Sequence, residues 1–462
     1  MKYLKHFVLA ALITAWVGVG NLSLVQAQTD SRFATFIQAD GLYRSGDVSA
    51  AEQLYRQVKP AFETTVSEVP APIYDAAALS VGSAVYWNNA QAAIAAGNSD
   101  AAINALQLLT ESQSEFIPAA LQLAEQLQAQ DRQDEAIEVL DRAAARYPDA
   151  SDVVMTQAQT LAAAGLPLES SIAAREFATL YPDHPQAGAF AQLAEAQLDR
   201  FMANRQRDNI VTGALNIFGG ILTGQRVPWS SWDDAMETYE IINLMASDEK
   251  EFGARVAAQY VEQLPLVTDP IVVDYVTQLG LEVARLMGRD FDYEFFVVQD
   301  SSINAFALPG GKIFVNTGAI LAANSQAELA GVLAHEAAHS VLSHGLQSVF
   351  RDGLIAQLGD QVQMGDFVAN LLTLHYSRRQ ERQSDILGTR VLSTAGYAAD
   401  GLRNFMATLG ANTSSSQSEY FSSHPASATR VEYLETLIQR NGYNRYALEG
   451  VDRHSEIQAM VG

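Results

Sequence analysis

The sequence of 462 residues contains no cysteine. This absence excludes disulfides, thiolate nucleophiles, iron–sulfur clusters and zinc sites built from cysteine. Any metal that the chain binds must therefore be held by His, Asp or Glu.

Basic residues are scarce as well. The chain has 29 Lys and Arg against 53 Asp and Glu, a net charge of −24. Nucleic acids and anionic lipid surfaces require clustered basic side chains, so neither is expected as the main partner. The length and the hydrophobic content of 48 % predict two or three domains, each large enough to bury a core.

The N-terminus has the pattern of a signal peptide. Lys2 and Lys5 precede an apolar run over residues 7–20, which is shorter than the roughly 20 residues that span a bilayer. Val25-Gln26-Ala27 matches a small-x-small cleavage site, and no cysteine follows it for lipidation. We predict a signal peptide at 1–27 and an exported, periplasmic protein of net charge −26; an uncleaved membrane anchor is the alternative.

Residues 28–200 are rich in Ala, Gln and Leu and are predicted to form successive amphipathic helices. The turn residues Gly97, Asp131 and Gly165 are 34 positions apart. This period is typical of tetratricopeptide repeats, whose helix pairs stack to bury their faces. A turn at Gly46-Asp47 is expected to open a divergent first repeat, and an irregular Ala-rich bundle is the alternative for the whole segment.

Residues 201–250 interrupt the repeats with an apolar, glycine-rich connector. Residues 209–232 of this connector include Trp229 and Trp232, and aromatic residues of this kind occur at lipid interfaces. A peripheral membrane contact or a substrate lid is one interpretation. We favour the other, a buried connector.

Residues 251–445 are predicted to form a second domain of mixed composition, followed by a C-terminal tail at 446–462. Residues 255–286 are predicted to be helical, with a second helix beginning at Pro270. The β-branched and aromatic runs 293–298 and 312–316 are predicted strands.

The second domain contains the motif His335-Glu336-Ala337-Ala338-His339. Residues four apart on a helix differ by about 40° in direction, so both imidazoles can face one ion. Glu336 points about 100° away from His335, within reach of a water on that ion. A catalytic zinc requires three protein ligands, so one ligand must come from elsewhere.

The predicted helix begins with a capping-box pattern at Ser325 and Glu328, and Gly345 is placed to end it. A third histidine of the metzincin type would fall at Gly345, which excludes that arrangement. On the same helix His344 would point about 180° from His335. We therefore predict that His344 is a C-terminal histidine favoured by the helix dipole and not a ligand.

A second helix is predicted to supply the missing carboxylate. Glu381 and Asp385 are four apart and share a face. One of them can ligate the ion while the other orients a ligand histidine. Because arginines surround both acids, an ordinary solvated helix is the alternative.

Four ordered motifs together resemble a known family. They are Asn304-Ala-Phe-Ala-Leu-Pro-Gly-Gly311, the His-Glu-x-x-His motif, Tyr376-Ser-Arg-x-x-Glu-x-x-Ser-Asp385, and His424-Pro425 with Arg430. The sequence is similar to the HtpX and CAAX-prenyl endopeptidase family of gluzincins, metallopeptidase family 48, over about residues 251–440. The exported, repeat-bearing organisation is similar to its BepA-like periplasmic branch, although here the repeats precede the catalytic domain.

The resemblance implies a zincin-like domain with a small sheet. Together with the helical repeats predicted before it, this domain makes the expected fold class α+β. It implies one zinc per chain held by His335, His339 and Glu381, with Glu336 as the general base. It also implies that a substrate peptide lies along an edge strand formed by Asn304, Ala305, Phe306 and Ala307.

The resemblance places His424 or Arg430, or both, near the metal, where a cation or imidazole can stabilise an oxyanion. In the alternative, His424 begins a helix and Arg430 pairs with an acid such as Asp385. Asp385 is then expected to orient a ligand histidine, to bind Arg430, or to do both.

We therefore expect a zinc endopeptidase that cleaves exported polypeptides, either misfolded or destined for the envelope. The repeats would bind substrates or an envelope-protein partner. The alternative is a periplasmic chaperone or adaptor for envelope-protein assembly, in which the protease is latent.

Overall fold

The computed structural model describes residues 31–62, 70–201, 203–204, 249–345, 376–411, 420, 424 and 428–462. The predicted signal peptide and the predicted membrane contact at 209–232 lie outside these residues. Within the described ranges, no helix combines the length and the hydropathy needed to cross a membrane.

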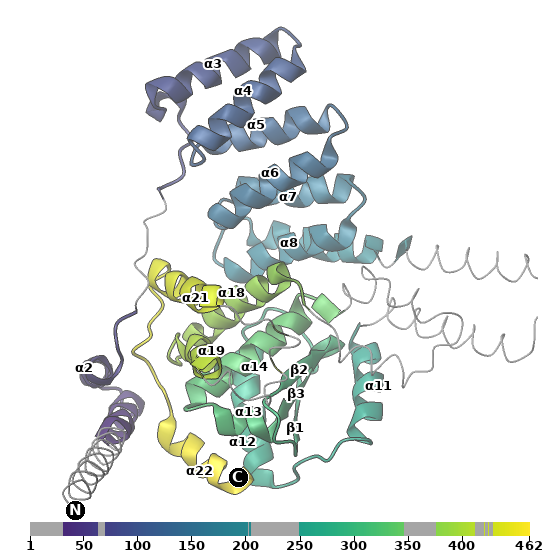
Figure 1. The fold of residues 1–462 in the computed structure, drawn as a ribbon. Helices are drawn as coiled ribbons and strands as arrows, with labels where there is room; N and C mark the ends of the chain where they lie inside the picture. The colour runs from purple at the N-terminus through teal and green to yellow at the C-terminus, as the bar shows by residue number, and fades with distance from the viewer. Residues whose placement is uncertain are drawn as a thin grey trace, which may run out of the picture.

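Residues 81–201, here called the repeat segment, form stacked antiparallel helix pairs (Figure 1). The pairs are α3 (Val81–Ala95) with α4 (Ser99–Ser112), α5 (Ile117–Gln128) with α6 (Gln133–Arg146), and α7 (Ser151–Ala163) with α8 (Pro167–Leu180). Residues 187–201 are also helical. Each pair packs on the next; α3–α6 share one apolar cluster, and α7 and α8 form another with the helix at 187–201.

The turn inside each pair has the same geometry. Gly97, Asp131 and Gly165 have φ angles of 69°, 56° and 77°, which lie in the left-handed region. Glycine and aspartate are among the residues that tolerate this region best. The predicted 34-residue period is therefore confirmed as a structural period.

The first helical hairpin does not stack on the repeat segment. Residues 31–44 and α2 (Val48–Val58) turn at Gly46, whose φ is 89°, as expected from Gly46-Asp47. However, the hairpin packs against the C-terminal end of the chain. Arg44 binds Asp452 at 3.1 Å, and the carboxylate of Asp40 accepts the backbone N–H groups of Glu449 and Val451.

The predicted C-terminal tail is instead a packed helix, α22 (Val451–Val461). Its N-cap Gly450 has no side chain, and the carboxylate of Asp40, from another part of the chain, accepts the first N–H of the helix, that of Val451. His454 is fully buried and binds the hydroxyl of Tyr275 at 2.6 Å. Sequence periodicity could not show this packing because the partners are about 180 to 410 residues away.

The C-terminal domain (the described part of 249–462) contains a three-stranded sheet of order β1-β3-β2. The strands are β1 (Glu294–Val298), β2 (Ala305–Leu308) and β3 (Lys312–Asn316). β1 runs parallel to β3, and β2 runs antiparallel to β3 through the short helix η2 (Pro309–Gly311). Both predicted strands are confirmed, and β2 forms an edge.

Helices pack around the sheet and against one another (Figure 1). They are α11 (Glu249–Val261), α12 (Pro270–Ala284), α13 (Thr317–Ala322), α14 (Gln326–Val341), α18 (Arg378–Thr394), α19 (Gly401–Ala411) and α21 (Ala428–Arg440). The central helix is α14, which packs on β2, α12, α18 and α19 and is buried from Ala327 to its end. The expected α+β class, with helical repeats before a small-sheet domain, is confirmed.

The repeat segment contacts the C-terminal domain through α18. Arg379 of α18 forms an ion pair of 2.8 Å with Asp141 of α6. Arg390, near the other end of α18, donates to the carbonyl of Thr179 in α8. The same helix therefore belongs to the core of one domain and to the junction with the other.

Lys59 joins the N-terminal hairpin to the C-terminal domain, and its substitution should destabilise the protein. Its ammonium is buried and pairs with Asp400 at 2.7 Å and with Glu449. Lys59→Met leaves these carboxylates buried without that cation, so we expect the free energy of unfolding to fall by about 3 kcal/mol in chemical denaturation.

Arg453→Met is the control for this variant. It removes an exposed pair with Glu456 on α22 and should change the free energy of unfolding by less than about 0.5 kcal/mol. Equal unfolding midpoints for the two variants would show that Lys59 does not hold the hairpin in place.

Candidate metal centre

Helix α14 presents His335, Glu336 and His339. Ser325 caps the helix by accepting the N–H of Glu328 at 3.2 Å, as the capping-box pattern predicts. The Glu328 carboxylate, however, binds Asn324 and not the N–H of Ser325, so only half of the box forms. The two histidines project from one face of α14, as their spacing predicts.

Helix α18 presents Glu381 and Asp385 toward α14. Its N-terminus is a complete capping box formed by Ser377 and Gln380. A Cβ atom added at Gly388 would lie 3.1 Å from the backbone nitrogen of His335, so glycine permits the close approach of the two helices. Both acids are almost fully buried, which rules out the solvated-helix alternative.

The donor atoms of His335, His339 and Glu381 converge on one point. The two Nε2 atoms are 3.1 Å apart. Nε2 of His335 lies 3.5 Å from Oε2 of Glu381, and Nε2 of His339 lies 3.5 Å from Oε1. Ligand atoms bound at about 2.0–2.1 Å to a tetrahedral ion are roughly 3.3 Å apart, so this spacing fits a metal ion.

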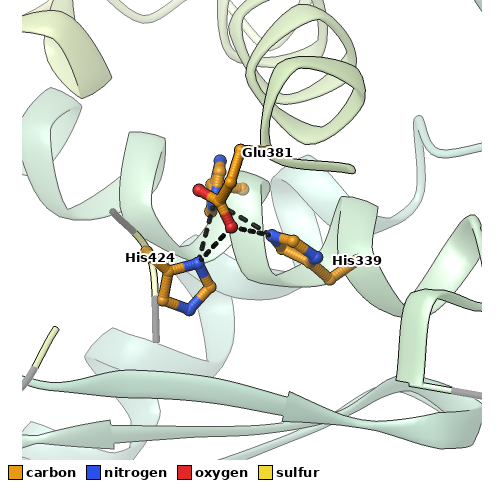
Figure 2. Close-up of side chains that lie close together, drawn as sticks. His339, Glu381 and His424 are labelled. Carbon is orange, nitrogen blue, oxygen red and sulfur yellow. Dashed lines mark hydrogen bonds and ion pairs between the residues drawn. The ribbon is translucent and has the colours of Figure 1, made fainter. Parts of the chain in front are cut away.

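His424 completes the group, as Figure 2 shows with His339 and Glu381. Its Nδ1 lies 3.0 Å from Oε1 of Glu381 and 3.4 Å from Nε2 of His335. The four residues can each offer one donor atom within 4.8 Å of the others. Two or three imidazoles with one carboxylate form a donor set that suits zinc, so the residues present fit the expected ion.

Asp385 and Arg430 hold the ligands in place. Asp385 Oδ1 lies 3.1 Å from Nδ1 of His335, so a proton on Nδ1 would face the carboxylate and leave the Nε2 lone pair directed at the ion site. Burial lowers the pKa of His335, but the carboxylates of Asp385 and Glu381 outweigh it and raise that pKa to about 9. Asp385 is therefore placed to orient His335, as one of its two expected roles requires.

The structure corrects the expectation that Arg430 meets an oxyanion. Its Nε and Nη2 donate to Asp385 at 3.0 and 2.7 Å, and its Nη1 lies 2.6 Å from Oε2 of Glu381. The guanidinium is buried behind the two carboxylates and compensates their charge. Arg430 is thus a positioning residue, and Asp385 fulfils both of its expected roles.

Glu336 lies beside the ligand group. It is fully buried, and its Oε1 is 3.5 Å from Nε2 of His424. Burial raises the pKa of Glu336, and the neighbouring His424 and His335 oppose the rise. Glu336 lies next to the ligand group but is not a member of it. This is the position expected of a general base.

Three aromatic or imidazole contacts were missed from the sequence. The ring of Tyr376 stacks on His339 at 3.9 Å, and that of Tyr420 stacks on His424 at 4.6 Å. The third is His344, whose Nδ1 is 2.9 Å from Nδ1 of His339. Burial lowers the pKa of His344 to about 3, so its imidazole is neutral near neutral pH.

The predicted direction of the His344 side chain was wrong because α14 ends earlier than predicted. The helix stops at Val341, and Ser343, not Gly345, adopts the left-handed conformation with a φ of 56°. The turn directs His344 back toward His339. A positive φ at serine leaves no clear signal in a single sequence.

Strand β2 lies next to α14, as the predicted peptide-binding strand requires. It contains Ala305, Phe306 and Ala307, and Asn304 precedes it. The hydroxyl of Ser340 on α14 donates to the carbonyl of Leu308 at the end of β2. The backbone N–H of Tyr420 donates to the carbonyl of Ile303, which brings the His424 segment to the same side of the sheet.

Comparison with known proteins supports the sequence resemblance. The chain is 29 % identical over 176 residues to the mitochondrial metalloendopeptidase OMA1 of Schizosaccharomyces pombe, covering 36 % of this chain and 52 % of that protein. It is 23 % identical over 258 residues to the beta-barrel assembly-enhancing protease of Escherichia coli K12, covering 50 % and 52 %. The metalloprotease YcaL of the same strain is 27 % identical over 173 residues, covering 34 % and 68 %.

The chain thus spans about half of the length of the first two of these relatives. Residues 271–438 match the family profile described as Peptidase family M48. This stretch contains α12, the sheet, α14, α18 and all four residues of the ligand group. The chain therefore carries a peptidase family M48 domain with relatives among the beta-barrel assembly-enhancing proteases.

Proposed function

We propose that the protein is a zinc metalloendopeptidase that cleaves exported polypeptides. The observation that carries the proposal is the convergence of Nε2 of His335, Nε2 of His339 and the Glu381 carboxylate, with Glu336 buried beside them. The support from other proteins is the M48 family profile and the protease names of the relatives.

When bound, the zinc acts as a Lewis acid toward the scissile carbonyl and the attacking water. Glu336 takes the proton from the attacking water and delivers it to the leaving amide nitrogen. Burial favours the protonated form of its carboxyl, which suits a group that must hold this proton between the two steps. The Nε2 side of His424 faces Glu336 and can donate to the developing oxyanion.

The edge strand β2 can align an extended substrate. In the described part of the chain β2 pairs with no strand except β3, which would allow a peptide to pair with its other edge at Ala305 and Ala307, beyond the bond from Tyr420 to Ile303. Backbone hydrogen bonds along such an edge bind peptides irrespective of much of their sequence. The contact between Ser340 and Leu308 fixes the distance between this edge and α14.

The repeat segment can bind unfolded polypeptide close to the metal centre. A cavity of about 1140 Å³ lies between α6–α8 and the helices α18 and α21. Its lining mixes charged, aromatic and aliphatic side chains, for example Glu176, Arg382 and Tyr433. This volume exceeds the usual range for small-molecule sites, which favours a polypeptide ligand.

A periplasmic location and envelope proteins as substrates complete the proposal. Their support is the N-terminal signal pattern and the name of the Escherichia coli relative, a protease that enhances beta-barrel assembly. A second function, that of a chaperone or adaptor, is favoured by the size of the cavity at the repeat segment.

Glu336→Gln should abolish proteolysis without removing zinc. We expect cleavage of unfolded casein to fall by about 10²–10⁴-fold, because Gln cannot accept the proton. Zinc content, measured by elemental analysis, should not change. Glu328→Gln on the same helix is the control: burial raises the pKa of Glu328 to about 8, so a neutral side chain there resembles its usual state. Equal activity in Glu336→Gln and wild type would refute the assignment of the base.

Removal of the metal should abolish the same activity. We expect about one zinc per purified chain, loss of casein cleavage with a chelator, and recovery on adding zinc. His335→Ala should lose the zinc, whereas His184→Ala, outside the ligand group, should keep it. Undiminished cleavage by the metal-free protein would contradict a metallopeptidase.

The protease and chaperone functions can be separated in cells. Glu336→Gln, expressed in a strain that lacks the wild-type protein, should fail to restore degradation of misassembled envelope proteins. The steady-state level of those proteins, measured by quantitative immunoblotting, is the readout. Full rescue of assembly by the inactive variant would support the chaperone function instead.

A further inference from the structure

A chain of hydrogen bonds connects the metal ligand His339 to the repeat segment. Nδ1 of His339 contacts Nδ1 of His344 at 2.9 Å. Nε2 of His344 contacts Oε1 of Gln383 at 3.2 Å, and Nε2 of Gln383 donates to Oε2 of Glu176 at 3.0 Å. We call His344, Gln383 and Glu176 the His344 chain; its last residue lies on α8 of the repeat segment.

The two ligand histidines of α14 differ in what holds their second nitrogen. Nδ1 of His335 faces the carboxylate of Asp385, which accepts a proton and so fixes the tautomer directly. Nδ1 of His339 faces Nδ1 of the His344 ring, which donates or accepts according to the tautomer of His344. His339 presents its Nε2 lone pair to a metal only if His344 accepts.

Glu176, the last residue of the His344 chain, determines whether His344 donates to His339 or accepts from it. Oε2 of Glu176 accepts from Nε2 of Gln383, so the amide oxygen of Gln383 is directed toward His344. That oxygen requires a proton on Nε2 of His344, which leaves Nδ1 of His344 to accept from His339. Ser384 Oγ, at 3.4 Å from the same Nδ1, is a longer and weaker contact.

We propose that the His344 chain holds His339 in the tautomer that binds the metal, and that it makes the metal affinity depend on the contact between α8 and α18. The members of the chain are positioning residues, since none of them belongs to the ligand group. The inference rests on the proposed metal site and deepens it, because it gives the repeat segment a direct influence on that site.

The test is the zinc dissociation constant of the full-length variants, measured by competition with a chromogenic chelator and independent of proteolysis. His344→Phe should raise it by about 10–100-fold, the usual effect of losing the partner of a ligand histidine. His344→Asn keeps an acceptor oxygen near the position of Nδ1 and should stay within about threefold of wild type. A purely structural role of the ring would not be rescued by Asn.

Glu176, the member of the His344 chain that lies in the repeat segment, is tested with a similar pair of variants. Glu176→Leu should raise the dissociation constant by roughly 3–10-fold, whereas Glu176→Gln keeps an acceptor and should change it less than about twofold. Arg390→Gln is the matched control, because it removes another hydrogen bond between α18 and α8 but does not touch the chain. It should bind zinc like wild type.

The outcomes separate the inference from the proposed function. If wild type binds zinc tightly and the Phe and Leu variants bind equally well, the inference is wrong and the metal site stands. If Arg390→Gln weakens zinc binding as much as Glu176→Leu, general loosening of the α8–α18 contact is the cause and the chain is refuted. If wild type binds no zinc, the proposed function fails first. Should His344→Phe not fold, the Glu176 variants decide.

Discussion

The close packing of α14 against α18 is the constraint on which the rest of the structure depends. One helix supplies His335 and His339 and the other supplies Glu381, so the ligand group exists only while the two helices remain in register. Gly388 permits this register, because any larger residue would press on the backbone at His335. The sheet, α12 and α19 surround the pair and bury α14 almost completely.

Burial of so many acids next to each other requires compensation. Glu336, Glu381 and Asp385 all lie out of water, and uncompensated carboxylates there would favour protonation or unfolding. Arg430 binds two of them, and the proposed ion would compensate the charge at Glu381 further. The whole chain has an excess of acidic residues. At the metal centre, however, Arg430 and the proposed divalent ion together would balance the three carboxylates.

The sequence predicted those features that depend on local spacing. The turns at Gly97, Asp131 and Gly165 follow from a period of 34 residues, and the common face of His335 and His339 follows from the helical period of 3.6. The strands β1 and β3 follow from local runs of β-branched and aromatic residues. The spacing of Glu381 and Asp385 placed both acids on one face, and the family resemblance singled out Glu381 as the expected ligand.

Features that depend on long-range packing could not be predicted in this way. The contact of α22 with the N-terminal hairpin joins segments about 410 positions apart, through Asp40 and Val451. The role of Arg430 depends on the direction in which α21 brings it to α18. His344 was misjudged because the left-handed Ser343 ends α14 early, and the helical angle was applied to a residue outside the helix.

Helix α18 has two faces with different tasks, and this gives the domain arrangement a physical meaning. Glu381 and Asp385 face α14, whereas Gln383 and Arg390 face α8. A polypeptide that enters the cavity between the repeat segment and α18 contacts residues next to the second face, such as Glu176. Under the proposal above, a shift of α8 on binding would change the hydrogen bond between Gln383 and Glu176, and the His344 chain would carry that change to His339. Substrate binding and metal affinity would then affect each other equally, as thermodynamic coupling requires.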